Sequence, residues 1–320
     1  MKRNRKLFFL LLTCILAASV ILAGCGKTNK SSTAKKPKIA LVMKSLANEF
    51  FKTMEDGAKA HQKSHESEYE LIANGIKDEQ DVAKQIDLVE QMIAQNVDAI
   101  VIAPADSKSL VPVCKRAIDA GIVVVNIDNK FDAGALADKK VKIPFIGPDN
   151  RKGAELAGKT LAEKLKAGDK VAIVEGVPNA FNATQRKLGF EDAVKSAKLN
   201  VVTSQTGNWE MDKANQVVSG MVTEHPDIKA ILCANDNMAL GAVAALKAAG
   251  KSDKVFVVGF DNISAVRQLV KDGKILATVD QHADKLAVFG IEYALEMVKA
   301  KSKPADRETP VDLITRLSLK

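Results

Sequence analysis

The sequence predicts an α/β protein of two lobes, each a doubly wound parallel sheet, on three observations. Short apolar runs alternate with amphipathic stretches from Lys38 onward, which is typical of parallel strands buried on both faces and joined by helices. Ten such runs are present, more than one sheet comfortably holds. The 320 residues are 47% hydrophobic and 27% charged, which excludes a disordered, collagen-like or polytopic membrane protein. We therefore expect two lobes of about 130 residues each.

The predicted strands are short and mostly continuous in apolar residues. They cover Ile39–Met43, Tyr69–Ala73, Ala99–Ala103, Val123–Ile127, Ile143–Ile146, Val171–Val174, Val201–Ser204, Ala230–Cys233, Val255–Val258 and Leu276–Val279. Between them, the predicted helix Gln80–Ala94 has a common apolar face at Val82, Ile86, Val89 and Ile93. A second predicted helix, Met238–Ala248, is rich in Ala and Leu and ends at Gly250.

The N-terminus has the features of a secretion signal with a lipid attachment site. A basic start, Met1–Lys6, precedes the apolar run Leu7–Ala23, and small residues precede Cys25. This order resembles a bacterial lipobox, in which the chain is cut before the cysteine and the cysteine is lipidated. A signal peptide cut elsewhere, or an uncleaved anchor helix, is the alternative, although the run is shorter than the ~20 residues of a typical span. We expect residues 1–24 to be the signal peptide, 25–37 a flexible tether, and Cys25 an extracytoplasmic membrane anchor.

The charge distribution argues against a nucleic-acid-binding protein, and the cysteine content argues against a metal-binding one. Nine of the 47 Lys and Arg residues, and no acidic residue, lie in the first 38 positions. The remainder is almost neutral and lacks the basic surface of a nucleic-acid-binding protein. Cys114 and Cys233 lie among apolar residues, so we expect buried, inert thiols. No Cys/His cluster has metal-binding spacing, and we expect neither a metal nor a cofactor.

Polar side chains follow many of the predicted strands. Open α/β sheets bind ligands beyond the carboxyl ends of their strands. The residues found there are Lys44, Asn48, Asp128, Trp209, Asn235, Asp236, Asp261 and Gln281. Carboxylates accept hydrogen bonds from hydroxyl groups, and amides both donate and accept. Such a set suits a neutral polyol.

Six stretches of sequence carry a family resemblance. They are Lys38–Phe51, Val123–Asp128, Gln185–Phe190, Ala234–Ala242, Val257–Asn262 and Ala277–Gln281. From about Lys38 to Lys320 the chain resembles the periplasmic sugar-binding proteins of the ribose class, which feed ABC transporters. Within that class it is most similar to the allose binders, through Met43–Asn48, Asn126–Lys130 and Asn208–Asp212.

The resemblance implies the periplasmic-binding-protein type I architecture. Two doubly wound lobes would be joined by three hinge crossovers, with the sugar in the cleft between the lobes. The crossovers would fall near Lys142–Pro148, Asp280–Asp284 and Arg307–Val311. The N-terminal lobe would then comprise residues 38–145 and 283–308, and the C-terminal lobe residues 146–282 and 309–320.

The resemblance also implies a role for each site residue. The implied ligand-binding set is Lys44, Asn48, Phe50, Phe51, Asp128, Arg186, Trp209, Asn235, Asp261 and Gln281. The aromatic residues would stack on the two faces of the sugar ring. The aspartates would accept from paired hydroxyls, the two basic residues would donate, and the amides would complete the network. Closure around the sugar would exclude water and strengthen these bonds.

Two departures leave the identity of the sugar open. Asn129 stands where ribose binders place a second arginine, which weakens a ribose assignment. Phe51 stands where the allose-type loop often carries tryptophan, which leaves the epimer undecided. Allose, psicose and ribose are the candidates.

Several site residues have simpler structural interpretations. Asp128, Asp261 and Asn235 are candidate helix N-caps. Arg186 is a candidate solvated charge on a helix, and Trp209 a candidate surface residue. Phe50 and Phe51 are candidate core residues, but neighbours about 100° apart on a helix cannot both face one core, so we expect at least one to point elsewhere.

Residues Gly153–Thr160 match the GxxxxGK[ST] phosphate-loop pattern. The intervening residues Ala154–Ala157 are good helix formers, and a cap near Asp149 or Asn150 would place the whole motif inside a helix. Helical N–H groups are already hydrogen bonded and cannot cradle phosphate. We therefore reject a nucleotide site.

The sequence thus predicts a solute-binding lipoprotein that captures a monosaccharide and delivers it to an ABC permease with ATPase subunits. We expect a monomer that is not an enzyme, since no nucleophile–base motif occurs. The same fold also admits a receptor for a sensory ligand such as a furanosyl autoinducer. A sugar-responsive repressor would need a helix-turn-helix where residues 1–38 hold a signal and a tether.

Overall fold

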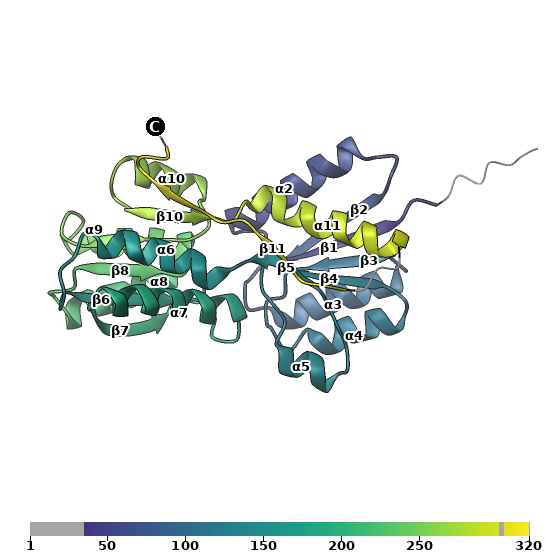
Figure 1. The fold of residues 1–320 in the computed structure, drawn as a ribbon, viewed down its shortest axis with the longest axis horizontal. Helices are drawn as coiled ribbons and strands as arrows, with labels where there is room; N and C mark the ends of the chain where they lie inside the picture. The colour runs from purple at the N-terminus through teal and green to yellow at the C-terminus, as the bar shows by residue number, and fades with distance from the viewer. Residues whose placement is uncertain (1–34, 301–303, 320) are drawn as a thin grey trace, which may run out of the picture. The chain divides into compact units, whose positions relative to one another are not determined.

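A computed structural model of the protein describes residues 35–300 and 304–319, which form two six-stranded sheets flanked by helices (Figure 1). The predicted signal peptide, Cys25 and most of the tether lie outside the described residues. None of the helices in the described ranges is both long and apolar enough to span a membrane.

The first sheet is entirely parallel, with strand order β11-β5-β4-β3-β1-β2. Its strands are β1 (Lys38–Ser45), β2 (Glu70–Ile76), β3 (Ala99–Ile102), β4 (Val123–Ile127), β5 (Phe145–Pro148) and β11 (Arg307–Thr309). Its helices are α2 (Glu49–Ser64), α3 (Val82–Ala94), α4 (Val111–Asp119), α5 (Ala133–Asp138) and α11 (Ala283–Ala300). Alternate β1 residues face opposite sides: Leu41 packs with the α2–α11 layer, and Val42 packs with the α3–α4 layer.

The second sheet has strand order β12-β10-β9-β8-β6-β7. Its strands are β6 (Lys170–Glu175), β7 (Asn200–Thr206), β8 (Ala230–Cys233), β9 (Phe256–Val258), β10 (Ala277–Asp280) and β12 (Asp312–Thr315). Its helices are α6 (Asn150–Ala162), α7 (Phe181–Ser196), α8 (Met211–Glu224), α9 (Asp236–Ala248) and α10 (Ser264–Lys271). Helices α6 and α7 pack together, as do α8 and α9. Strand β12 pairs antiparallel with β10, so this sheet is parallel except at one edge.

The chain passes between the sheets three times. The crossings follow β5 at Asp149, follow β10 at Gln281 and His282, and follow β11 at Pro310 and Val311. The expected lobe boundary is wrong in detail, because residues 146–148 belong to β5 and extend the first lobe to Pro148. Thr309 likewise pairs within the first sheet. Strands β11 and β12 were not predicted as strands, since three or four residues carry too little periodicity to be recognised.

The packing of α3 differs from its predicted apolar face. Val89 is fully buried as expected, but Val82, Ile86 and Ile93 are only partly buried. The face is rotated because Gln85 turns inward and donates hydrogen bonds to two backbone carbonyls, and it accepts from Ala105 N at 2.7 Å. A buried amide that satisfies three backbone groups stabilises this orientation.

The phosphate-loop pattern lies inside a helix, as expected from its helix-forming residues. Helix α6 begins after Asp149, whose side chain caps it by accepting from Lys152 N at 3.0 Å. Lys159 is on the exposed side and pairs with Glu155 at 2.6 Å. The two cysteines also behave as predicted: Cys114 and Cys233 are free and fully buried, and burial raises the pKa of both thiols, to about 12 for Cys114.

Candidate functional site

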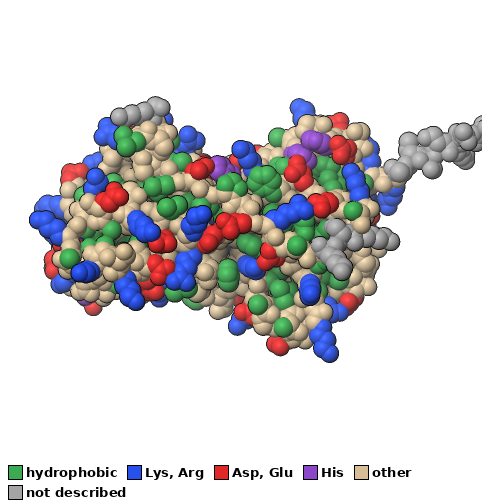
Figure 2. Space-filling model, viewed as in Figure 1, with side chains coloured by type: hydrophobic (Ala, Val, Ile, Leu, Met, Phe, Trp, Pro, Cys, Tyr) green, Lys and Arg blue, Asp and Glu red, His purple; other side chains and the backbone are tan. Residues whose placement is uncertain are grey.

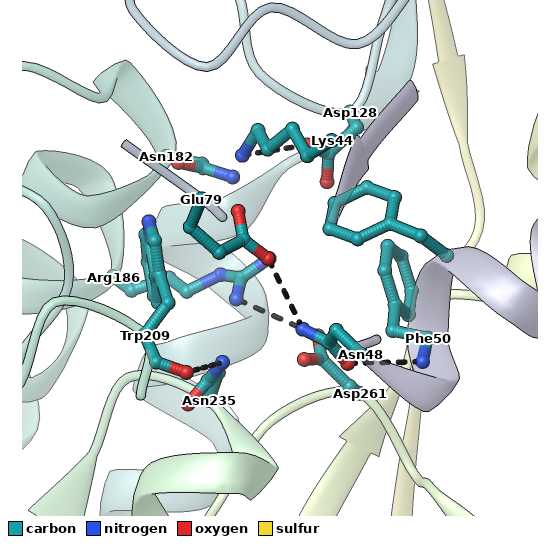
Figure 3. A pocket seen from close by; sticks show the side chains of 11 residues that line it. Lys44, Asn48, Phe50, Glu79, Asp128, Asn182, Arg186, Trp209, Asn235 and Asp261 are labelled. Atoms are coloured by element: carbon teal, nitrogen blue, oxygen red, sulfur yellow. Dashed lines mark hydrogen bonds and ion pairs between the residues drawn. The ribbon is translucent and has the colours of Figure 1, made fainter. Parts of the chain in front are cut away.

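A cavity lies at the carboxyl ends of strands from both sheets (Figure 3). Its lining residues are Lys44, Asn48, Phe50, Phe51, Glu79, Asp128, Asn182, Arg186, Trp209, Asn235 and Asp261. Nine of the ten residues predicted to bind ligand are in this set, all of them buried. The tenth, Gln281, does not line the cavity.

The first sheet supplies an ion pair to the cavity. Lys44 lies at a register shift between Met43 and Ser45 near the end of β1, where a bulge turns the chain. Asp128 directly follows β4, and its φ of 60° is in the left-handed region. Lys44 Nζ lies 3.1 Å from Asp128 Oδ2, and both side chains are buried. The next helix, α5, is capped by Asp132 and not by Asp128, whose side chain lines the cavity instead.

Helix α2 starts at the cavity wall and is held there by Asn48. The Asn48 side chain accepts from Phe50 N at 3.0 Å and caps the helix, while its Nδ2 donates to Glu79 Oε1 at 3.3 Å. Phe50 and Phe51 both line the cavity, with ring centroids 5.1 Å apart in an edge-to-face arrangement. At least one of them was expected to face away from the core, and both reach the cavity. The cavity lies over the first turn of α2, where it can touch two adjacent side chains.

Helix α7, which follows β6 of the second sheet, supplies the basic residue Arg186, which has more partners than Lys44. Arg186 Nε donates to Asn150 Oδ1 at 2.8 Å, and its Nη1 donates to Ala234 O at 2.9 Å. Nη1 is also 3.5 Å from Asp261 Oδ1, and the guanidinium lies 3.8 Å from the centre of the Phe260 ring. With only 2% of its surface exposed, Arg186 is not a solvated helix charge.

Asp261 follows β9 and has a φ of 120°, so it shares the left-handed backbone of Asp128 and likewise caps no helix. Gln281 Nε2 donates to Asp261 Oδ1 at 2.7 Å, which places Gln281 behind the aspartate. Burial raises the pKa of Asp261 to about 8, although Arg186 opposes that shift. Gln281 therefore orients a cavity residue through its Nε2, and its own contact with ligand stays a prediction.

Trp209 and Asn235 complete the wall formed by the second lobe. Trp209 is 4% exposed, which rules out the surface interpretation. Asn235 caps α9 by accepting from Met238 N at 2.9 Å and also donates to Trp209 O at 3.2 Å. Asn235 is therefore both the N-cap of α9 and a residue of the cavity wall.

Sequence reasoning missed two cavity residues, Glu79 and Asn182. Glu79 lies in the loop after β2, and Asn182 is the second residue of α7, which follows β6. Both therefore lie beyond the carboxyl ends of strands, the signal that identified the others. Burial raises the pKa of Glu79 to about 7. Despite three carboxylates in the cavity, no described group of His, Cys, Asp and Glu is arranged to hold a metal.

The two lobes are also joined by hydrogen bonds around the cavity. Phe181 N donates to Ser107 Oγ at 3.0 Å, and Asn182 N donates to Asn129 Oδ1 at 3.2 Å. Ser264 donates to both carboxylate oxygens of Glu49. Asn129, which departs from the ribose pattern, is thus fully buried and links the lobes.

The sequence profile of the periplasmic binding protein domain matches residues 39–302. This chain belongs to the periplasmic binding protein family. Its place in the ribose and allose class is shown by the D-ribose/D-allose-binding protein of Pseudomonas aeruginosa, 56% identical over 94% of this chain and 97% of that one. The D-allose-binding periplasmic protein of Escherichia coli is 33% identical over 86% of this chain and 89% of that one.

Solved structures of the periplasmic binding protein family share the fold. An ABC transporter solute-binding protein from Burkholderia multivorans is 60% identical with a TM-score of 0.87, covering 88% of this chain and 100% of that one. Another from Actinobacillus succinogenes, with bound D-allose, is 36% identical with a TM-score of 0.83, covering 89% and 99%. The predicted type I architecture is confirmed. Membership in this family of solute-binding proteins also confirms that the protein is not an enzyme.

Proposed function

We propose that this protein captures a monosaccharide of the allose, psicose or ribose type in the cavity between its sheets and delivers it to an ABC permease. The observation that carries the proposal is the composition of the cavity. Two buried aspartate–cation pairs, Lys44–Asp128 and Arg186–Asp261, face a space walled by three aromatic rings. A sugar has both kinds of surface, since its ring presents C–H faces and its rim presents hydroxyls.

Each chemical group in the cavity has a counterpart on a sugar. Phe50, Phe51 and Trp209 offer apolar faces to the C–H surfaces of the ring. The aspartates accept from hydroxyls, while Lys44 and Arg186 donate to hydroxyl or ring oxygens. Because the site is buried, a sugar that lacks one hydroxyl leaves a polar group unpaired, which gives selectivity.

Anchoring and delivery complete the proposal. A lipid on Cys25 would hold the protein at the extracytoplasmic face of the membrane, beside a permease and its ATPase subunits. The protein would act there as a monomer. On the face shown in Figure 2, basic and acidic side chains are interspersed, unlike the basic surface of a nucleic-acid-binding protein.

A thermal-shift screen of the full chain in detergent tests the ligand class. Allose, psicose, ribose, galactose, glucose, xylose and a furanosyl autoinducer are compared, since a ligand that binds only the folded protein raises its Tm. We expect selective shifts with allose or psicose. A shift with ribose alone would support a monosaccharide carrier but change the sugar. A shift with the autoinducer alone would favour the sensory receptor. No shift with any sugar would contradict the proposal.

The anchor is tested by Cys25→Ala. We expect the variant to lose incorporated fatty acid and to leave the membrane fraction. Cys14→Ala is the matched control, because Cys14 lies in the predicted signal peptide and its replacement should leave anchoring unchanged. Continued lipidation of the Cys25→Ala protein would contradict the lipobox assignment.

A further inference from the structure

Glu79 is a cavity carboxylate that the family resemblance assigns no role. Asp128 and Asp261 each have a basic partner in the cavity. Glu79, within the described part of the chain, has no Lys or Arg nitrogen within the 4.0 Å of an ion pair, yet only 3% of its surface is exposed. Buried carboxylates without a partner are rare in structural positions, because desolvation of the charge is uncompensated.

The two carboxyl oxygens of Glu79 differ in their partners. Oε1 accepts from Asn48 Nδ2 at 3.3 Å, the contact drawn in Figure 3. Oε2 is inaccessible to solvent and, among the described residues, has no hydrogen-bond partner. Asn48 cannot rotate to serve it, because its own oxygen caps α2 through Phe50 N. One acceptor therefore remains for a group that enters the cavity.

The charges around Glu79 limit what that group can be. Lys44 favours the ionised carboxylate, whereas Asp128 and Glu210 oppose it. Three carboxyl groups line the cavity beside two basic side chains, and burial raises the pKa of Glu79 and Asp261, so the cavity carries little net charge. A neutral hydroxyl donor fits both the charge balance and the free oxygen.

We propose that Glu79 is a specificity-determining residue that contacts the bound sugar, its Oε2 accepting the hydrogen of one sugar hydroxyl. This inference rests on the proposed function, since it takes a monosaccharide as the ligand. An analogue that lacks the hydroxyl leaves Oε2 unpaired, and the protein discriminates against it. The rival role is positional: Glu79 would only hold Asn48 in place.

Isothermal titration of the full chain with D-allose and its monodeoxy analogues separates the two roles. We expect Glu79→Ala to bind D-allose at least tenfold more weakly than the unaltered protein, because the hydrogen bond between the sugar and the carboxylate is lost. For one monodeoxy sugar, the two proteins should bind within about twofold of each other, because the contact is already absent. Glu79→Gln, which keeps the shape but not the charge, should show a smaller loss at the same hydroxyl.

The neighbouring Asp78→Asn is the matched control, because Asp78 is an exposed acid in the same loop and its replacement should leave every affinity unchanged. An equal loss for all the sugars would show that Glu79 only positions Asn48, and unchanged affinity would show no contact. Either result overturns the inference while leaving the proposed function intact. Failure of the unaltered protein to bind any sugar would instead overturn the proposed function.

Discussion

Each half of the cavity contains an aspartate paired with a basic side chain, but the two pairs differ in how firmly they are held. Each half places its aspartate in the left-handed region just after a central strand and opposes it with a basic side chain. In the second half, Arg186 is held by Asn150, Ala234 and a ring stack, and Gln281 holds its aspartate. In the first half, Lys44 has Asp128 as its ion-pair partner and lies 5.5 Å and 5.8 Å from the centres of two aromatic rings.

The difference separates a preorganised half from an adaptable one. A guanidinium fixed by several acceptors loses little freedom when a ligand arrives, so its donors are already aimed. A lysine on a flexible stem can turn from Asp128 to a sugar oxygen. We infer that the second half fixes the orientation of the sugar and the first half adjusts to it.

Asp128→Ala and Asp261→Ala have the largest expected effect. Removing one partner of a buried charge pair costs roughly 2–5 kcal/mol, so sugar affinity should fall by at least ~30-fold in each variant. Titration followed by the fluorescence of Trp209, the chain's single tryptophan, measures this, and circular dichroism checks the fold. Retained affinity in both variants would remove this site.

Arg186→Lys tests the rigid half directly. A single ammonium cannot reach the acceptors that the guanidinium fork contacts, and it loses the stack on Phe260. We expect affinity to fall about tenfold and stability by about 1–3 kcal/mol, read from urea unfolding. The control is Arg151→Lys, an exposed arginine paired with Asp192, which should change little. Equal effects of the two changes would contradict a preorganised second half.

The ligand-free protein should lose stability as the pH rises from about 6.5 to 8. Burial raises the pKa of Glu79 and Asp236 to about 7 and of Asp261 to about 8. In this pH range the folded protein binds more protons than the unfolded chain. The free energy of unfolding therefore falls as the pH rises and the three carboxyl groups lose their protons. His61 acts in the opposite direction, but only below 6.5, because its pKa is lowered.

Urea midpoints across this pH range measure the effect, and Glu79→Gln should reduce the slope because it removes one of the three groups. At pH 8 the variant should be more stable than the unaltered protein when no sugar is present. A slope that is the same in both proteins would show that Glu79 does not titrate in this window.

Lys159→Ala should have the smallest effect. Lys159 is exposed on α6 and pairs with Glu155 one turn away, a contact worth about 0.3–0.5 kcal/mol. Sugar affinity should be unchanged and Tm should move by no more than ~2 °C. A large loss of binding would reopen the phosphate-loop interpretation of Gly153–Thr160.

Much of the fold could be read from the sequence because the signals are local. The predicted strand Ala230–Cys233 coincides with β8, and nine of ten predicted ligand residues line the cavity. The failures follow from contacts between distant segments. The hydrogen bond from Gln281 to Asp261 joins residues on different strand ends, and the strand-end pattern alone could not predict it. Gln85 rotates α3 through acceptors on other strands, which no helical periodicity records.

The sequence by itself determined the alternation of strands and helices and the polar residues at strand ends, since both depend on neighbouring residues. Only the tertiary structure decided which side chains meet. Lys44 pairs with Asp128 and Arg186 with Asp261 across long stretches of chain, and Glu79 is left with one free oxygen. Such pairings depend on the order of the strands in each sheet and on burial, and both arise only when the whole chain packs.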